Sequence, residues 1–416
     1  MTAPDRTAAV ATRALFTLTG PDRPGLTAAV VAALGSSPDA AVEVHDVEQV
    51  VLRGHLVLGL SVALYGDPVP VVTALEAAAD SLGLEVETRL DVPPARPRTS
   101  KHHVILLGRP LAASALAVVA ARVADVGGNI DAITRLSRYP VTSLELMVSG
   151  AEGESLRVAL SEVASATGID IAVERAGLAR RAKRLVVFDV DSTLITGEVI
   201  EMLAAHAGCE AEVARVTEEA MRGDLDFAES LRRRVALLEG LDASVLADVR
   251  DALELTPGAR TLIRTLKRMG YRCGIVSGGF TQVTDHLVET LDLDFSAANT
   301  LEVVDGRFTG RVVGEIVDRP GKAVALRRFA EAAGVPLSQT VAVGDGANDI
   351  DMLTAAGLGI AFNAKPALRA VADTAINQPY LDAVLFFLGI SRDDVEAADI
   401  EDPELGAPVY GPDGAW

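Results

Sequence analysis

The stretch LVVFDVDSTL, residues 185–194, decides how the second half of this chain folds. Four apolar residues predict a buried strand, and two aspartates, Asp189 and Asp191, follow at its end. Alternate side chains of a strand point the same way, so the two carboxylates should repel each other unless a cation or a proton lies between them. Mg²⁺ takes carboxylate and phosphate oxygens as ligands. The stretch therefore indicates phosphoryl transfer, with one aspartate as nucleophile and the other as proton donor. The alternative is a solvated turn.

A second acidic corner lies in TVAVGDGAND, residues 340–349. Again an apolar strand ends in acid, and Asp345 and Asp349 are four residues apart, on one face of a helix that begins there. Metal coordination explains this pair. The alternative is a helix cap with turn residues.

Two further motifs suit the binding of a phosphoryl group. In IVSGGF, residues 275–280, a strand ends in Ser277 and Gly278, whose hydroxyl and backbone N–H groups predict a phosphate cradle. In PGK, residues 320–322, Lys322 stands at the head of a predicted helix, where its charge would offset that of a transferring phosphoryl group. Taken alone, Ser277 and Lys322 are more often structural residues.

In this order, the four motifs resemble those of the haloacid dehalogenase-like phosphatases. More narrowly, residues 184–389 are similar to phosphoserine phosphatases, whose motifs DVDSTL, VSGGF and GDGAND are present letter for letter. The resemblance implies hydrolysis of O-phospho-L-serine to L-serine and phosphate, the final step of serine biosynthesis, through an aspartyl phosphate.

The resemblance also implies a role for each motif residue. Asp189 is the nucleophile, and Asp191 is the proton donor and later the base. Mg²⁺ is bound by Asp189, Asp345 and the backbone carbonyl of Asp191. The other motif residues hold the phosphoryl group or support substrate and metal: Ser277, Gly278, Lys322, Asn348 and Asp349.

A helical cap that selects the substrate is implied over residues 197–256. In the family, a glutamate at the place of Glu198 meets the substrate amino group. The segment MRGDLDFAESLRRR, residues 221–234, resembles the family's cap motif. Of its three consecutive arginines, 232–234, the alignment favours Arg234, whose planar guanidinium suits a carboxylate. The substrate-binding residues implied by this segment are Met221, Phe227 and Arg234.

Strand and helix patterns alternate over the second half, which predicts a doubly wound parallel sheet, the Rossmann-like fold of this family. In such sheets ligands bind at the carboxyl ends of the strands, where three of the motifs lie. Residues 294–313 predict a β-hairpin, which we interpret as a flap beside the sheet and outside the site. Strands are predicted near 185–189, 272–276, 340–344, 357–361 and 373–377.

The first part of the chain contains a repeat, in which Gly20 and Gly108 are 88 residues apart. Each copy leads a strand into glycine, then a helix, two paired strands, a second helix and a last strand, which predicts two ferredoxin-like β-α-β-β-α-β units. The segment GPDRPGL, residues 20–26, resembles the opening of ACT domains, regulatory modules that often bind an amino acid. The second copy departs from this pattern, with GRPL at residues 108–111.

An amino-acid effector would find backbone N–H groups near Gly20 and Gly108, if helices start there. L-serine is the natural candidate because it is the pathway product. Asp22 would cap the first helix. The alternative for both units is a dimerisation scaffold.

Composition predicts the boundaries of four regions. A proline-rich connector at 92–100 separates the two repeats, and a basic run at 175–184 precedes the phosphatase part. The predicted regions are ACT-like domains at 1–94 and 101–176, a phosphatase domain at 184–395, and a loosely held acidic, Gly/Pro-rich tail at 396–416.

The charge and cysteine content narrow the function further. A net charge of −20 argues against nucleic acid and anionic membranes as partners. Two cysteines, Cys209 and Cys273, give no disulfide framework, and no apolar run is long enough for a membrane span, so we expect a cytoplasmic protein, as a homodimer. Two alternatives stay open: a phosphatase or phosphotransferase for another small phosphorylated metabolite, and an amino-acid-sensing regulator with a vestigial phosphatase.

Overall fold

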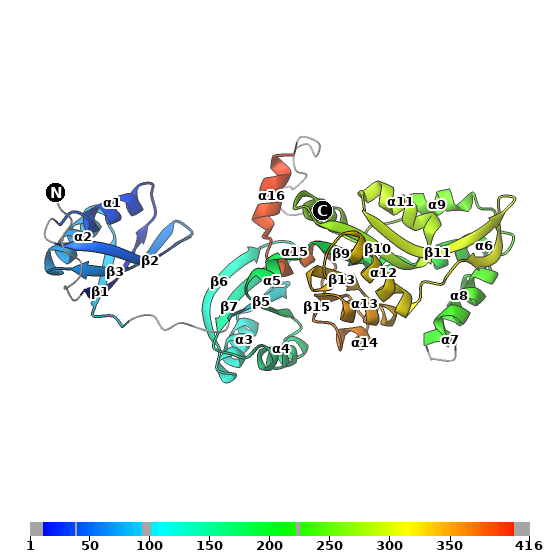
Figure 1. Ribbon diagram of the computed structural model, residues 1–416, viewed down its shortest axis with the longest axis horizontal. Helices are drawn as coiled ribbons and strands as arrows, with labels where there is room; N and C mark the ends of the chain where they lie inside the picture. The colour runs from blue at the N-terminus through cyan, green and yellow to red at the C-terminus, as the bar shows by residue number, and fades with distance from the viewer. Residues whose placement is uncertain (1–10, 38–39, 94–100, 222–224, 403–416) are drawn as a thin grey trace. The chain divides into compact units, whose positions relative to one another are not determined.

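The computed structural model describes residues 11–37, 40–93, 101–221 and 225–402. The chain forms two compact units, residues 1–97 and 98–416 (Figure 1). Within the described ranges, no helix combines the length and the apolar character that a membrane crossing requires.

The first unit is a four-stranded antiparallel sheet with strand order β2-β3-β1-β4. On β1, one of the two inner strands, the alternate residues Ala14, Phe16 and Leu18 are buried. They pack against Val30 and Leu75 of the two helices. The β-α-β-β-α-β order confirms the predicted ferredoxin-like unit. Its elements are β1 (Thr12–Pro21), α1 (Leu26–Leu34), β2 (Ala41–Leu52), β3 (His55–Tyr65), α2 (Val69–Leu82) and β4 (Glu85–Leu90).

The second unit begins with a repeat of this fold, with strand order β6-β7-β5-β8. Val104 and Leu106 face the helices of the repeat, whereas Ile105 and Leu107 face the other way and join the core of the larger domain. The second ferredoxin-like unit is thereby packed against the larger domain. Its elements are β5 (Lys101–Gly108), α3 (Ala113–Asp125), β6 (Asn129–Ser137), β7 (Thr142–Ser149), α4 (Gly153–Thr167) and β8 (Asp170–Arg175).

The larger domain is built on a seven-stranded sheet with order β12-β11-β10-β9-β13-β14-β15. Every pairing is parallel except that of β11 with β12. The parallel pairings and the central position of β9 confirm the predicted doubly wound architecture. The strands are β9 (Leu185–Phe188), β10 (Arg272–Phe280), β11 (Phe295–Val304), β12 (Arg307–Val313), β13 (Thr340–Gly344), β14 (Gly359–Phe362) and β15 (Thr374–Ile376).

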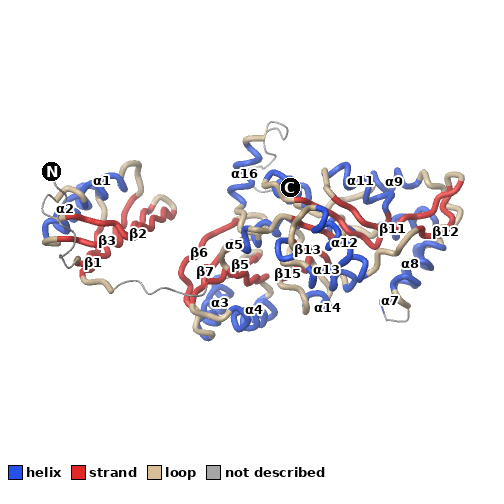
Figure 2. Tube along the Cα trace, viewed as in Figure 1, coloured by secondary structure: helices blue, strands red, loops and turns tan. Residues whose placement is uncertain are grey.

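Helices cover both faces of this sheet, which is why β9 is apolar throughout (Figure 2). Leu185 and Val187 pack on one face with α12 and α13, and Val186 and Phe188 pack on the other with α10 and α11. The helical elements are α5 (Leu178–Arg181), η1 (Val190–Leu194), α10 (Ala259–Arg268), α11 (Thr281–Leu291), α12 (Arg319–Ala332), η2 (Leu337–Gln339), η3 (Ala347–Asp349), α13 (Ile350–Ala355), α14 (Pro366–Arg369), η4 (Leu381–Ala383), α15 (Val384–Phe387) and α16 (Arg392–Ile400).

Four helices inserted after β9 form a cap. The chain leaves and re-enters the sheet domain at one place, because Ile195 bridges Leu255 and the Thr256 N–H donates to the Leu194 carbonyl at 2.9 Å. The insertion therefore forms a separate lobe above the sheet edge. Its helices are α6 (Val199–Ala207), α7 (Glu210–Met221), α8 (Phe227–Ala236) and α9 (Val245–Asp251).

Two predictions about this domain need correction. The hairpin is present, but β11 pairs with β10 and so extends the sheet, and the Gly240 N–H donates to the Phe308 carbonyl at 2.9 Å, so the hairpin also contacts the cap. The predicted tail does not start at residue 396, because α16 continues to Ile400 and Asp399 pairs with two arginines of α10. Residues 403–416 lie outside the described part.

Candidate active site

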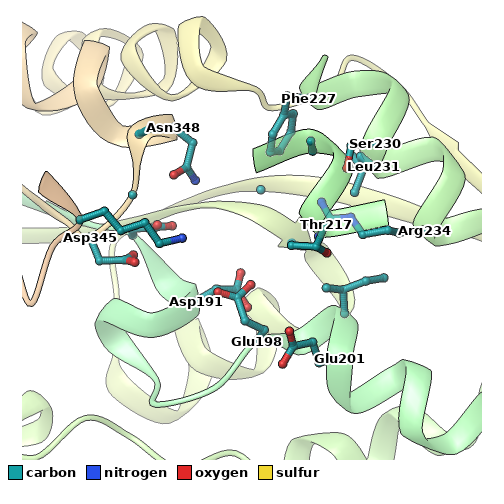
Figure 3. Close-up of a pocket in the computed structure, with 18 of the residues that line it drawn as sticks. Asp191, Glu198, Glu201, Thr217, Phe227, Ser230, Leu231, Arg234, Asp345 and Asn348 are labelled. Carbon is teal, nitrogen blue, oxygen red and sulfur yellow. The ribbon is translucent and has the colours of Figure 1, made fainter. Parts of the chain in front are cut away.

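Three strand ends converge at one edge of the large sheet. β9 ends before Asp189, β10 carries Ser277, and β13 ends just before Asp345. Because β9 lies between β10 and β13, their carboxyl ends share one edge. Figure 3 shows residues from this edge around a pocket that Phe227 and Arg234 of the cap face from the other side.

The irregular turn Val190–Leu194 positions the carboxylates of Asp189 and Asp191. Ser192 has a φ of 59°, in the left-handed region that non-glycine residues rarely adopt. Its hydroxyl donates to Glu198 Oε1 at 3.1 Å. The next residue, Thr193, donates from Oγ1 to Asp345 Oδ1 at 3.2 Å and accepts from Thr256 Oγ1 at its carbonyl at 2.7 Å. Side chains from the cap entry, the cap exit and β13 thus hold this turn in place.

An ammonium lies between two of the acids. Lys322 Nζ is 2.7 Å from Asp189 Oδ1 and 2.7 Å from Asp349 Oδ1, and the lysine side chain is fully buried. Burial and the charge of Asp349 raise the pKa of Asp189 well above its ordinary value, although Lys322 acts in the opposite direction. Burial lowers the pKa of Lys322, but its two carboxylate partners more than offset this. One buried ammonium therefore lies between two buried acids and can neutralise only one of them when both are ionised.

Three of the carboxylates fit a divalent cation. Ligand oxygens of Asp189, Asp345 and Asp349 all lie within 4.8 Å of one another. Burial, followed by the charge of Asp349, raises the pKa of Asp345 to about 6. A bound cation would relieve this repulsion, and carboxylate oxygens are ligands that hard cations prefer. The donor set is therefore suited to a metal ion.

The carboxyl of Asp191 has different partners. Its Oδ1 accepts from the Val199 N–H at 2.8 Å, and its Oδ2 accepts from Ser277 Oγ at 3.0 Å. Burial raises the pKa of Asp191. A positioned carboxyl whose pKa is raised is suited to proton donation.

The loop at the end of β10 is tightly folded around Ser277. The Gly279 N–H donates to Ser277 Oγ at 2.7 Å, and a side chain at Gly279 would place its Cβ 3.0 Å from Asp191 Oδ2. Asn299, which is buried, donates to the Gly278 carbonyl at 2.8 Å and accepts from the Val317 N–H. The sequence analysis missed Asn299 because it lies inside β11, outside every motif. Its amide fixes the predicted phosphate cradle.

Opposite charges line the cap side of a pocket of about 640 Å³. Burial, then the charge of Asp191, raises the pKa of Glu198 to about 7. Burial lowers the pKa of Arg234, while Glu198 and Asp191 act in the opposite direction. Arg234 is the one member of its arginine run that lines the pocket, and its two neighbours are exposed, as the sequence analysis expected.

The cap closes directly over the phosphate cradle. A Cβ at Gly278 would lie 2.9 Å from Cζ of Phe227, so glycine is needed where the ring packs. Asn348 and Lys365 also line the pocket, and Lys365 is a residue that no motif marked. Met221 ends α7, and its side chain lies outside the described part of the chain.

The predicted effector residues do not lie at helix starts. Gly20 pairs with Leu56 inside the sheet, and α1 begins at Leu26 with Gly25 as its N-cap. Asp22 is exposed and caps no helix, and Gly108 ends β5 while α3 begins at Ala113. The prediction that helices start at these glycines is wrong, because a turn of several residues separates each glycine from its helix. A role for the three residues in effector binding stays a prediction.

Three stretches of the sequence match known domain families. Residues 186–354 match the haloacid dehalogenase-like hydrolases, and residues 12–89 and 100–174 each match the ACT domain. A phosphoserine phosphatase of Streptomyces coelicolor is 60% identical over 398 residues, which cover 94% of this chain and 96% of that protein. The chain belongs to the phosphoserine phosphatase family.

Similarity to other phosphoserine phosphatases also extends over most of the chain. Phosphoserine phosphatase SerB2 of Mycobacterium tuberculosis is 57% identical over 395 residues, 93% of this chain and 96% of that protein. A solved structure, a probable phosphoserine phosphatase from Vibrio cholerae in unliganded form, is 34% identical with a TM-score of 0.55, and covers 72% of this chain and 89% of that one. The predicted combination of ACT and haloacid dehalogenase-like domains is confirmed.

Proposed function

We propose that this protein hydrolyses O-phospho-L-serine to L-serine and inorganic phosphate, with Asp189 as the nucleophile. The observation that supports it best is the pairing of two features around one pocket. On the sheet side, Asp189 lies 2.7 Å from buried Lys322. On the cap side, Glu198 and Arg234 present opposite charges.

The cap-side charges suit a zwitterionic substrate. The guanidinium of Arg234 would bind the substrate carboxylate, since Arg presents several N–H donors in one plane. The carboxylate of Glu198 would bind the ammonium group. Phe227 would exclude water from the phosphoryl group, because its ring already packs over Gly278.

In the first chemical step, an Asp189 carboxylate oxygen attacks phosphorus and the bond from phosphorus to the seryl oxygen breaks. Asp191 transfers its proton to the departing seryl oxygen, so L-serine leaves neutral at that oxygen. Lys322, the Ser277 hydroxyl and the backbone N–H of Gly278 stabilise the charge on the transferring phosphoryl oxygens.

In the second step, Asp191 takes a proton from a water molecule whose oxygen attacks phosphorus. The acyl-phosphate bond to Asp189 breaks, inorganic phosphate leaves, and both aspartates return to their starting state. The Val199 N–H keeps the Asp191 carboxyl in one orientation through both steps.

The cofactor that we propose is Mg²⁺. Asp189, Asp345 and the backbone carbonyl of Asp191 would hold it, with Asp349 in support, as the compact oxygen donor set favours. When bound, the ion neutralises charge on the carboxylates and on the phosphoryl oxygens.

Phosphate release from a panel of small phosphomonoesters, with Mg²⁺ and with EDTA, tests this function. We expect phosphoserine to be preferred and EDTA to abolish turnover. Preference for a phosphomonoester without an amino or carboxylate group would favour the alternative of another small phosphorylated metabolite. Absence of turnover on every compound would favour a vestigial phosphatase.

We also propose that the ACT domains bind an amino-acid effector, with L-serine as the first candidate, and that the protein is a homodimer. The two family matches to ACT domains support this. Calorimetric titration with L-serine and light scattering of the full chain test the two parts. A monomer that shows no heat of serine binding would contradict both.

A further inference from the structure

Two buried polar atoms in the wall of the pocket have no hydrogen-bond partner among the described residues. They are Ser230 Oγ and Arg234 Nε, both on α8. Ser230 is 2% exposed, and its backbone N–H is already bonded to the Asp226 carbonyl. Buried polar groups are normally paired, because leaving one unpaired costs stability. Two such atoms in one wall therefore indicate a ligand that pairs with both.

The helix places these two atoms on one face. Residues four apart in an α-helix are neighbours on its surface, and Phe227, three residues before Ser230, lies on the same face. All three residues line the pocket, and Figure 3 shows them together on the cap side. The serine hydroxyl can reorient by rotation about one bond, so no backbone movement is needed for it to meet a ligand.

The hydrogen-bonding capacity of Ser230 Oγ and Arg234 Nε favours a carboxylate as the ligand. Arg234 Nε can only donate, and a serine hydroxyl beside it can donate as well. A carboxylate has two oxygens and accepts from both. The acids that would suit an ammonium group, Glu198 and Asp191, belong to other elements of the wall.

We propose that Ser230 determines specificity by donating a hydrogen bond to the substrate carboxylate, beside Arg234 Nε. This inference rests on the proposed function and adds a residue to it. It requires that loss of the Ser230 hydroxyl weakens the binding of compounds that carry a carboxylate and leaves the binding of other phosphate compounds unchanged.

The test compares Ser230→Ala with the wild-type protein, using phosphoserine as substrate. Two competitive inhibitors without a carboxylate, O-phosphoethanolamine and inorganic phosphate, complete the set. Because a hydrogen bond to a charged group is lost, we expect KM for phosphoserine to rise about tenfold or more, with kcat within about twofold. The inhibition constants of both inhibitors should not change. Ser230→Thr, which keeps the hydroxyl, should restore most of the affinity.

Ser244→Ala is the matched control, since Ser244 is an exposed serine of the cap outside the pocket. Thermal unfolding of each variant shows whether it is folded. An unchanged KM in folded Ser230→Ala would overturn the proposal, and so would an equal loss of affinity for phosphoethanolamine, which would place the hydroxyl at the ammonium. A wild-type protein that releases no phosphate from phosphoserine would instead contradict the proposed function.

Discussion

Lys322 and Asp189 form a buried ion pair, with Lys322 Nζ 2.7 Å from Asp189 Oδ1. The same ammonium pairs with Asp349 at 2.7 Å. An ion pair in this position would have two effects. It compensates two acids that are shielded from water, and it places a positive charge beside the proposed nucleophile.

Replacing the ammonium tests the first effect. In Lys322→Met, two buried carboxylates lose their cation, so we expect the free energy of unfolding to fall by about 3–5 kcal/mol. Urea denaturation without divalent metal measures it. Lys267→Met is the control, because Lys267 is more exposed and pairs at 3.2 Å with Asp292 and Asp294, so its loss should cost about 0–1 kcal/mol. Equal costs for the two variants would show that the buried pair contributes no special stability.

Replacing the nucleophile tests the proposed mechanism. Asp189→Asn keeps the size of the side chain but removes the attacking oxygen anion, so phosphate release should fall to background while the fold is retained. Asp305→Asn is a matched control, because Asp305 lies in an exposed turn with a φ of 50° that asparagine also adopts. Substantial turnover by Asp189→Asn would exclude an aspartyl phosphate at this residue.

Adding one methyl group tests cap closure. In Gly278→Ala, the new Cβ would lie 2.9 Å from Phe227 Cζ, so the ring must move. Because small misplacements in a site are costly, we expect kcat/KM for phosphoserine to fall about 10- to 100-fold. Adding Phe227→Leu should recover part of the loss. Gly35→Ala, where the nearest atom is 3.9 Å away, should have no effect. If the double variant recovers nothing, the contact with Phe227 is not the cause.

Much of this arrangement was predictable because its signals are local. A buried parallel strand must be apolar on both faces, and an acid at its end must then lie at the ligand edge of the sheet, so Asp189 and Asp345 could be placed from their neighbours in sequence. The inward turn of Arg234 came from family resemblance alone.

The features that escaped prediction depend on partners distant in sequence. Asn299 of β11 donates a hydrogen bond to the Gly278 carbonyl of the neighbouring strand β10. The hairpin joins the sheet only because β11 pairs with β10. Asp399 holds the last helix through arginines of α10. The helix starts in the ACT domains were predicted too early, at Gly20 and Gly108. A glycine marks a turn but does not show how many residues separate that turn from the next helix.

The pH dependence of substrate binding tests Glu198. Burial and nearby acids raise the pKa of Glu198 to about 7, so below that pH the free protein holds it protonated, without the charge that an ammonium group needs. We therefore expect kcat/KM for phosphoserine to rise with pH, with a midpoint of about 7. Bound Mg²⁺ would lower the pKa of Glu198 and so move this midpoint to a lower pH. Glu198→Gln should lose this limb and about 10- to 100-fold in kcat/KM. A limb that persists in Glu198→Gln would assign it to another group.

The contact between the second ACT domain and the phosphatase domain should also depend on pH. Arg180 pairs with Glu145 of β7 at 2.5 Å and donates from Nε to the Phe387 carbonyl at 3.1 Å. Burial raises the pKa of Glu145, but hydrogen bonds and charges from His103 and Arg180 outweigh it and lower the pKa to about 2. A lowered pKa means that the pair stabilises the folded state fully above about pH 4.5 and loses this effect as the pH falls toward 2.

Glu145→Gln should therefore unfold at a lower temperature than the wild type at pH 7, with a difference of up to about 3 kcal/mol in unfolding free energy. The difference should shrink steadily between pH 5 and pH 3, since protonation removes the same charge from the wild type. Thermal unfolding across this range measures it. Glu154→Gln, which removes an exposed partner of Arg157, should differ from the wild type by no more than about 1 kcal/mol at every pH. A constant gap for Glu145→Gln from pH 7 to pH 3 would mean that packing, and not the charge of Glu145, maintains the contact between these domains.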